Sequence, residues 1–187
     1  MPRLFIAIDI PDHLKDNICE LRRNLPGVKW TVRDQLHITM RFIGDTDDPL
    51  FNQIKSSLSE IKLPSFGLEL TSPGFFPNER RPSVFWLECG EARALSDLKD
   101  YMDLALDSCG IPPESRRFHP HITVARLKMP SEKDCHKLSN IFKDTFSARF
   151  NVSEFILYSS LLKADGAEHS KECVYQLLSA SPTSLKE

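Results

Sequence analysis

The tetrapeptide His37-Ile38-Thr39-Met40 has a close copy, His121-Ile122-Thr123-Val124, which begins 84 residues later. Both follow the pattern histidine, apolar residue, threonine, apolar residue, and both lie in stretches rich in β-forming residues. Because successive side chains of a strand point to opposite faces, each copy is expected to present its histidine and threonine on one face. The repeat therefore predicts two strands of the same design, each carrying an imidazole beside a hydroxyl.

Two such strands carry the groups that hydrolysis of a phosphodiester requires. One imidazole takes a proton from the attacking water and the other protonates the departing oxygen, and histidine can do either near neutral pH. The hydroxyls of Thr39 and Thr123 can donate to non-bridging phosphate oxygens, where charge develops in the transition state. A single His-x-Thr in a strand is usually structural, whereas two matched copies indicate an acid–base pair, His37 and His121. The rate is expected to follow a bell in pH with its maximum near neutrality.

A metal centre is the alternative use of these histidines. The chain has six histidines but no H-E-x-x-H, and His119-Pro120-His121 is an H-x-H pair whose two side chains would share one face. No carboxylate or cysteine stands at a matching spacing, and threonine is a poor zinc ligand. We therefore predict no metal and no other cofactor, and we expect activity to survive chelation.

The elements that carry these motifs are indicated by hydrophobic periodicity and turn residues. The pattern predicts a loop at 73–82 and an α+β domain, because several strands are adjacent in sequence, which favours antiparallel or mixed sheets over a doubly wound parallel one. The predicted strands are residues 4–10, 28–30, 36–43, 66–70, 84–87, 119–127, 150–159 and 174–178, and the predicted helices are 12–25, 50–61, 92–109 and 131–146.

Length and charge set the organisation. The 187 residues fit a single domain, 1–187, with a loose tail at 181–187. A net charge of −2 argues against a basic surface overall, so any nucleic-acid footprint must be a local patch. The arginine pairs at 80–81 and 116–117 are either loop charges or the places that hold an RNA backbone.

Cysteine usage and the N-terminal segment point to the cytoplasm. The five cysteines are far apart and form no C-x-x-C pair, which is typical of reduced thiols. The apolar run at residues 4–8 is short and ends at Asp9, which is typical of a strand and not of a signal peptide. No apolar stretch is long enough to span a membrane, and we expect a monomer.

Further segments accompany the two motifs in order along nearly the whole chain. They are Arg3-Leu4-Phe5-Ile6-Ala7-Ile8, Val28-Lys29-Trp30-Thr31-Val32, Gln35-Leu36-His37, Phe42-Ile43-Gly44, Gly74-Phe75-Phe76-Pro77, Arg81-Pro82-Ser83-Val84-Phe85-Trp86, Phe118-His119-Pro120-His121, Ala125-Arg126 and Phe155-Ile156-Leu157-Tyr158-Ser159-Ser160. In this arrangement the chain resembles the two-histidine (2H) phosphoesterase superfamily, and within it the RNA 2′,3′-cyclic phosphodiesterases, also called 2′-5′ RNA ligases.

This resemblance implies a fold and a reaction. The fold is bilobal with pseudo-twofold symmetry, antiparallel or mixed sheets lining a central cleft, helices outside, and one motif strand in each lobe (37–40 and 121–124). His37 matches the family's proton donor and His121 its proton acceptor, and the product is a 2′-phosphomonoester. The implied substrates are RNA ends with 2′,3′-cyclic phosphates, such as tRNA fragments, or related nucleotides, with weak reverse 2′-5′ joining.

The resemblance also suggests how the phosphate is held. Arg126 matches the family's phosphate-associated arginine, although strict alternation would turn it away from the site unless a bulge or twist follows Thr123. His119 stands where relatives usually have arginine, and is either a weaker, pH-dependent phosphate donor or a surface replacement. By alternation alone, Arg41 shares the face of His37 and is either a phosphate contact or a solvated surface residue.

Several alternatives remain open at the level of sequence. Phe5 and Trp30 either stack on a base or pack in the core. The substrate could instead be a small cyclic nucleotide, an ADP-ribose cyclic phosphate or a 2′-5′ oligonucleotide. A non-catalytic module that binds RNA ends is a further alternative, which a turnover assay on cyclic-phosphate-ended oligonucleotides would separate.

Overall fold

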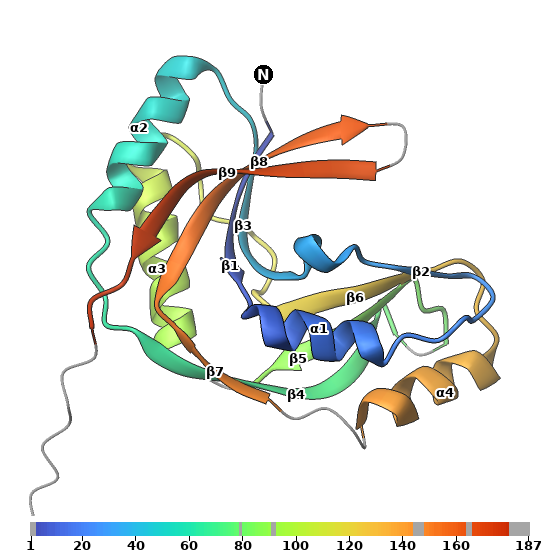
Figure 1. The fold of residues 1–187 in the computed structure, drawn as a ribbon. Helices are drawn as coiled ribbons and strands as arrows, with labels where there is room; N and C mark the ends of the chain where they lie inside the picture. The colour runs from blue at the N-terminus through green and yellow to red at the C-terminus, as the bar shows by residue number, and fades with distance from the viewer. Residues whose placement is uncertain (1–2, 79, 91–92, 144–147, 164–165, 180–187) are drawn as a thin grey trace, which may run out of the picture.

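The computed structural model describes residues 3–78, 80–90, 93–143, 148–163 and 166–179, and the predicted tail at 181–187 lies outside them. These residues form nine strands, four α-helices and one 3-10 helix (Figure 1). In chain order the elements are β1 (Arg3–Asp9), α1 (Asp12–Glu20), β2 (Val28–Trp30), η1 (Arg33–Gln35), β3 (His37–Asp45), α2 (Asp48–Ser59), β4 (Phe66–Phe76), β5 (Val84–Cys89), α3 (Arg93–Asp107), β6 (His121–Leu127), α4 (Glu132–Lys143), β7 (Ala148–Val152), β8 (Glu154–Lys163) and β9 (Gly166–Gln176).

The named strands pair antiparallel throughout, in the order β7-β4-β5-β6-β3-β1-β8-β9, with β2 beside β6. The order divides into two halves of four strands that meet at β3 and β6. These two strands are joined by one residue pair, Ile38 and Ile122, the second residues of the two tetrapeptides. The predicted α+β class with antiparallel sheets is confirmed, and the motif strands are the innermost strands of the two halves.

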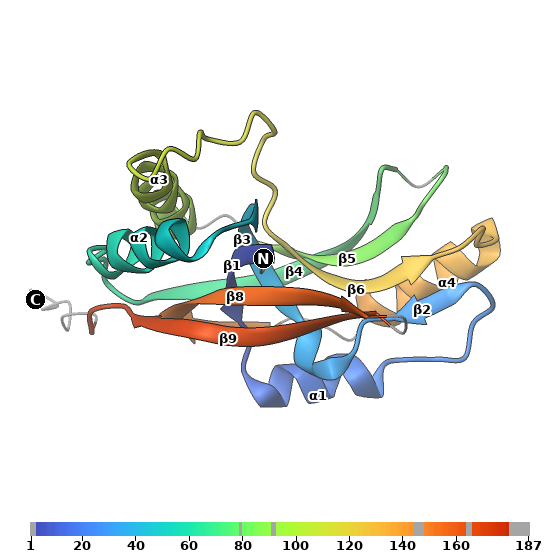
Figure 2. The ribbon, with the colours of Figure 1, turned by 90° about the horizontal axis from the view of Figure 1, so that it is seen from above.

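The helices cover the ends of this sheet. Helices α2 and α3 pack side by side at one end of the molecule, and α4 lies at the other (Figures 1 and 2). The apolar residues of both motifs, Ile38, Met40, Ile122 and Val124, are at most 1% exposed and belong to the main core. They anchor each motif strand from the face opposite its histidine, as the alternation predicts.

Local chemistry sets the helix boundaries. Helix α2 begins where the side chain of Asp47 accepts a hydrogen bond from the backbone N–H of Leu50 at 2.9 Å, and proline occupies its first turn. Helix α1 ends at Glu20, short of the predicted 25. There the side chain of Arg22 donates to the carbonyl of Thr31, and the indole of Trp30 donates to the carbonyl of Arg23. These bonds tie the segment after α1 to the chain around β2 instead of extending the helix.

Two predicted boundaries are wrong for reasons of strand pairing. Strand β4 runs on through Pro73 to Phe76, where a loop was expected. Its pairing with β7 ends at Leu70, so the missing N–H of Pro73 removes no ladder bond on that side. The predicted strand 150–159 is two strands in opposite halves of the sheet. Strand β7 is the edge strand beside β4, and β8 lies between β1 and β9 and forms a long hairpin with β9.

Candidate active site

Alternation in β3 is broken at Met40. On the neighbouring strand β1, the consecutive residues Ile6 and Ala7 pair with Arg41 and Thr39. Met40 between them has no partner on β1 and forms a β-bulge. After the bulge the faces exchange. Phe42, which alternation places with Ile38, instead lines the cleft and is 65% exposed.

The same bulge turns Arg41 away from the site, so the prediction that Arg41 shares the face of His37 is wrong. Arg41 is 3% exposed and lies against α3 and the chain that follows it. Its guanidinium is 3.6 Å from a carboxylate oxygen of Asp103 and 3.2 Å from one of Glu114, and it donates to the carbonyl of Pro112. Arg41 is therefore a buried structural cation.

Strand β6 has the matching bulge at Val124. On the neighbouring β5, Phe85 pairs with Ala125 and Trp86 pairs with Thr123, so Val124 has no partner on β5. The strand therefore turns Arg126 to the cleft side, where it lines the same cavity as Thr123. The predicted bulge after Thr123 is present, and it resolves the conflict between alternation and the position of Arg126.

One cleft of about 840 Å³ collects the predicted residues His37, Thr39, Thr123 and Arg126. One wall is the segment from β2 to η1, and the opposite wall is the β8–β9 hairpin. The side chain of Gln35 donates to the carbonyl of Ala167 and so joins the two walls. Because β3 and β6 run antiparallel around the pair Ile38–Ile122, each motif histidine lies on the side of the other motif's threonine.

His37 lies deep in this cleft. Its Nε2 is 3.1 Å from Oγ1 of Thr39, and the backbone of Gln35 accepts a hydrogen bond from the ring. The rings of Phe5 and His169 are 5.3 and 5.6 Å away between centroids. Burial lowers the pKa of His37 to about 4, and the positive charge of His169 adds to the effect.

His121 has the same local design. Its Nδ1 donates to the carbonyl of His119 at 2.7 Å, so each motif histidine bonds to the backbone two residues before it and directs Nε2 elsewhere. The rings of Phe76 and Trp86 lie 5.0 and 6.0 Å from the ring of His121. Burial lowers the pKa of His121 as well. Both imidazoles are therefore oriented by backbone and held in largely aromatic surroundings.

The structure places His119 beside His121, with ring centroids 6.2 Å apart. The ring of His119 is exposed and packs edge-on against Trp86, 4.9 Å between centroids. This position allows a phosphate contact, and that role stays a prediction.

The two aromatic candidates both have packing partners. Phe5 is 4% exposed and stacks on Tyr158 at 5.1 Å, within a small apolar cluster on the cleft face. Trp30 packs toward Phe142, 6.3 Å between ring centroids. The aromatic side chain that the cleft leaves exposed is Phe42.

His169 belongs to the site and was missed in the sequence. It lines the cleft on β9, next to Phe5 and His37, although it lies 132 residues from the first motif. The sequence places it before the predicted strand 174–178, and only the register of the long β8–β9 hairpin brings it to His37. No local motif marks it.

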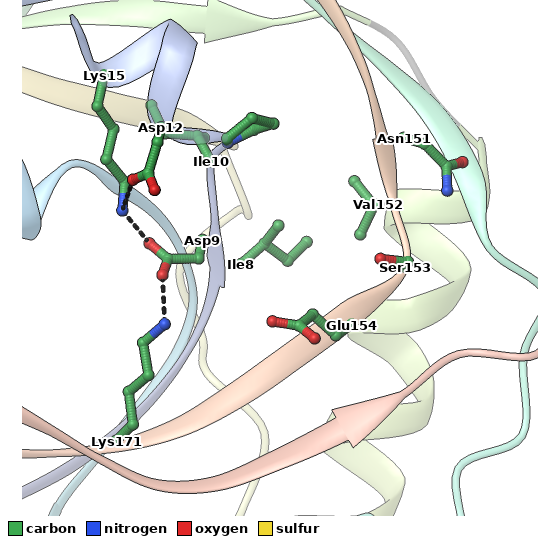
Figure 3. Close-up of a pocket in the computed structure, with 11 residues that line it drawn as sticks. Ile8, Asp9, Ile10, Asp12, Lys15, Asn151, Val152, Ser153, Glu154 and Lys171 are labelled. Carbon is green, nitrogen blue, oxygen red and sulfur yellow. Dashed lines mark hydrogen bonds and ion pairs between the residues drawn. The ribbon is translucent and has the colours of Figure 1, made fainter.

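Asp9 is a second residue that sequence analysis did not single out. It pairs with His37 across β1 and β3. Its carboxylate lies between Lys15, at 3.0 Å, and Lys171, at 2.7 Å, along one side of a smaller pocket of about 320 Å³ (Figure 3). Burial opposes its ionisation, but the bonds from the two lysines hold the pKa of Asp9 below its ordinary value. Asp9 thus keeps a compensated negative charge beneath the first motif.

Two features of the described part of the chain bear on rival functions. Its histidine, cysteine, aspartate and glutamate side chains form no group of three that could hold a metal ion. Among the same residues, no helix is both long enough and apolar enough to cross a membrane. Metal independence itself stays a prediction.

Similarity to known proteins shows the family to which the chain belongs. A family model described as the 2′-5′ RNA ligase superfamily matches residues 10–163. The chain is 34% identical over 154 residues to an RNA 2′,3′-cyclic phosphodiesterase of Aeropyrum pernix, covering 81% of this chain and 86% of that protein. It is 28% identical over 167 residues to the protein of the same name from Methanocaldococcus jannaschii, covering 88% and 94%.

The fold agrees with solved structures. A crystal structure of a phosphoesterase superposes with a TM-score of 0.77 at 25% identity, covering 95% of this chain and 98% of that one. Escherichia coli LigT complexed with 3′-AMP gives a TM-score of 0.77 at 24% identity, covering 95% and 99%. The fold is thus that of the two-histidine phosphoesterases. The chain belongs to the 2′-5′ RNA ligase superfamily, as its motifs predict.

Proposed function

We propose that this protein is an RNA 2′,3′-cyclic phosphodiesterase that opens terminal cyclic phosphates to 2′-phosphomonoesters with His37 as acid and His121 as base. The observation that carries the proposal is the pair of bulged His-x-Thr-x strands, joined at Ile38 and Ile122 on the face opposite the cleft. Its relatives in Aeropyrum pernix and Methanocaldococcus jannaschii carry this activity in their names.

The proposed reaction is an in-line displacement at phosphorus. Water attacks phosphorus and gives its proton to His121, whose Nδ1 bond to the His119 carbonyl leaves Nε2 as the accepting atom. The bond from phosphorus to O3′ breaks, and His37 gives its proton to O3′. The phosphate stays on O2′, and a second proton exchange resets the pair.

The remaining site residues hold the phosphate in this scheme. The hydroxyls of Thr39 and Thr123 line the cleft together with His37 and donate to non-bridging oxygens. His121 is not among the residues that line this cleft, and the pairing of Ile38 with Ile122 places it on the side of Thr39. Arg126 supplies the fixed positive charge, and His119 adds a donor when protonated. Joining of a 5′-hydroxyl uses the same pair in the same roles, with the hydroxyl in the place of water. His121 takes the hydroxyl proton, the bond from phosphorus to O3′ breaks, His37 protonates O3′, and a 2′-5′ linkage forms.

The test is an assay of the purified chain in EDTA on an oligoribonucleotide that ends in a 2′,3′-cyclic phosphate. Phosphorus NMR then reads which isomer forms. A 2′-phosphate supports the assignment, whereas a predominant 3′-phosphate would exchange the roles of His37 and His121. Binding without turnover would favour a module that only binds RNA ends. Loss of activity in EDTA that zinc or manganese restores would support a metal mechanism.

The same assay decides between substrates. Cyclic mononucleotides, ADP-ribose cyclic phosphate and 2′-5′ oligonucleotides are run beside the RNA, since all can be served by one pair of imidazoles. Action on tRNA fragments, a monomeric state and a cytoplasmic location remain predictions. Size-exclusion chromatography with light scattering checks the monomeric state.

A further inference from the structure

Two cations face each other at one end of the cleft. In the pairing of β2 with β6, Lys29 lies directly opposite Arg126, and both side chains line the cleft. Both are exposed, and within the described residues neither makes an ion pair or a side-chain hydrogen bond. Like charges directly opposite each other destabilise a strand pair. A pair of this kind in a cleft is suited to an anion that bridges the two cations.

The position of the pair relative to the two motifs indicates which anion. Arg126 follows Thr123 by three residues on β6, so the rise of a strand separates them by roughly 7–10 Å. Lys29 is level with Arg126 on the neighbouring strand, so both cations lie at this distance along the sheet from the β3–β6 junction. This separation is comparable with the spacing of successive phosphates in an extended single strand.

The carboxylates that line the cleft leave Lys29 and Arg126 available to bind an anion. Two carboxylates also line the cleft, those of Asp34 and Glu168. Asp34 lies 3.2 Å from the guanidinium of Arg33, and Glu168 stands on β9, in the opposite wall. Beside Lys29 on the same segment, Val32 is 60% exposed, which offers an apolar surface to a sugar or base.

We propose that Lys29 binds the phosphodiester that joins the last two nucleotides of an RNA whose terminal cyclic phosphate lies at the histidine pair, and that Arg126 contacts both this phosphate and the reacting one. The inference rests on the proposed function and specifies its substrate class. A cyclic mononucleotide has no second phosphate, so Lys29 gives the enzyme its preference for RNA ends over mononucleotides.

The experiment compares two substrates with four proteins. Wild type, Lys29→Gln and the control Lys133→Gln, which removes the same charge from the exposed face of α4, are assayed on uridine 2′,3′-cyclic phosphate and on a trinucleotide with the same end. Lys29→Gln should lower kcat/KM on the trinucleotide by about three- to tenfold and change the mononucleotide value by less than about twofold. Lys29→Arg should restore the preference, because it restores the charge.

The salt dependence gives an independent measure. Binding of a trinucleotide that ends in a 2′-phosphate is followed by fluorescence anisotropy at several salt concentrations. Loss of one phosphate contact should reduce the slope of log K against log salt by about 0.7 in Lys29→Gln, and leave it unchanged in the control. These binding data stand even if wild type turns over neither substrate, in which case the proposed function fails and the subsite does not.

Two results would overturn the inference. Equal losses on both substrates would place Lys29 at the reacting phosphate and not at a second one. No loss on the trinucleotide, with an unchanged salt slope, would show that Lys29 contacts no phosphate.

Discussion

The two motif histidines share one hydrogen-bond design but differ in their surroundings. Each ring bonds to the backbone two residues earlier, which fixes its orientation. His37 has a second imidazole, His169, 5.6 Å away and Asp9 across the neighbouring strand, whereas His121 lies among Phe76, Trp86 and His119. Two similar side chains therefore have different surroundings, and in the free protein burial lowers the pKa of His37, the proposed acid, to about 4 and also lowers that of His121.

Replacing either histidine tests the pair. His37→Ala and His121→Ala should each lower kcat by about 10² to 10⁴, and the double variant should be little worse than the weaker single. Steady-state and single-turnover kinetics measure the loss, and circular dichroism checks the fold. The control is His136→Ala, an exposed histidine on α4 whose loss should leave kcat unchanged. A single variant of the pair with near wild-type activity would show that the residue is not part of the machinery.

The pH optimum follows from the lowered pKa values. In the free protein the pKa of His37 is about 4 and that of His121 lies below 6.5, so kcat/KM should be highest between about pH 4 and 6.5, on the acid side of the neutral optimum expected from sequence. The bound phosphate favours the protonated rings, so the optimum of kcat should lie at higher pH. A kcat/KM maximum above pH 7 would contradict this.

His169→Asn sharpens that test. It removes the positive charge that lowers the pKa of His37, so the acidic limb of kcat/KM should move to higher pH. If His37 is the acid and has the lower pKa, only a minor fraction of the protein carries its proton on His37 alone, and raising this pKa enlarges that fraction. The plateau of kcat/KM should then rise. If His37 is the base, the limb moves but the plateau does not rise.

At the scale of elements, the matching bulges at Met40 and Val124 decide which residues reach the cleft. Alternation alone correctly placed the four residues of each motif. It failed after the fourth, because a bulge depends on the neighbouring strand and leaves no local signal in the sequence. The position of Arg126 was recovered through the family resemblance, which required a bulge. No family resemblance was available for Arg41, and the prediction that it lies on the face of His37 was wrong.

The corrected place of Arg41 has an energetic consequence. Arg41→Gln leaves the carboxylates of Asp103 and Glu114 without this cation in a buried setting, and should lower the free energy of unfolding by about 3 kcal/mol. Urea unfolding measures this. Arg93→Gln, which breaks an exposed i,i+4 pair with Asp97, should change it by less than about 0.5 kcal/mol. If Arg41→Gln instead lost activity with an unchanged free energy of unfolding, Arg41 would have to contact the substrate.

For the whole molecule, the sequence was informative wherever the evidence was local or repeated. The two motif strands and an antiparallel or mixed sheet followed from patterns within about ten residues and their duplication, whereas the central cleft followed from the family resemblance. The walls of the cleft did not, because His169 reaches His37 and Lys29 reaches Arg126 only through pairings across much of the chain. Long-range register of this kind is set by packing of the whole sheet, which no short window contains.

Folding around neutral histidines makes the stability of the whole molecule depend on pH. Burial lowers the pKa of His37, His121 and His169 below the value of about 6.5 that each has in the unfolded chain. Below pH 6.5 the unfolded chain therefore binds more protons than the folded one, so the free energy of unfolding must fall as the pH falls. Each ring that is neutral when folded and protonated when unfolded contributes about 1.4 kcal/mol per pH unit.

We therefore expect stability to be greatest near pH 7 and to decline progressively toward pH 4, where His37 itself becomes protonated and its contribution ends. Urea unfolding at pH 7.5, 6.5, 5.5 and 4.5 measures the slope. His37→Gln removes the most strongly shifted of these groups, so its slope between pH 6.5 and 4.5 should be shallower than that of wild type, whereas His136→Ala should keep the wild-type slope. A wild-type stability that is flat or rises toward pH 4.5 would show that these rings are already protonated in the folded protein. In that case the acidic optimum expected for kcat/KM would fail with it, because both rest on the same neutral imidazoles.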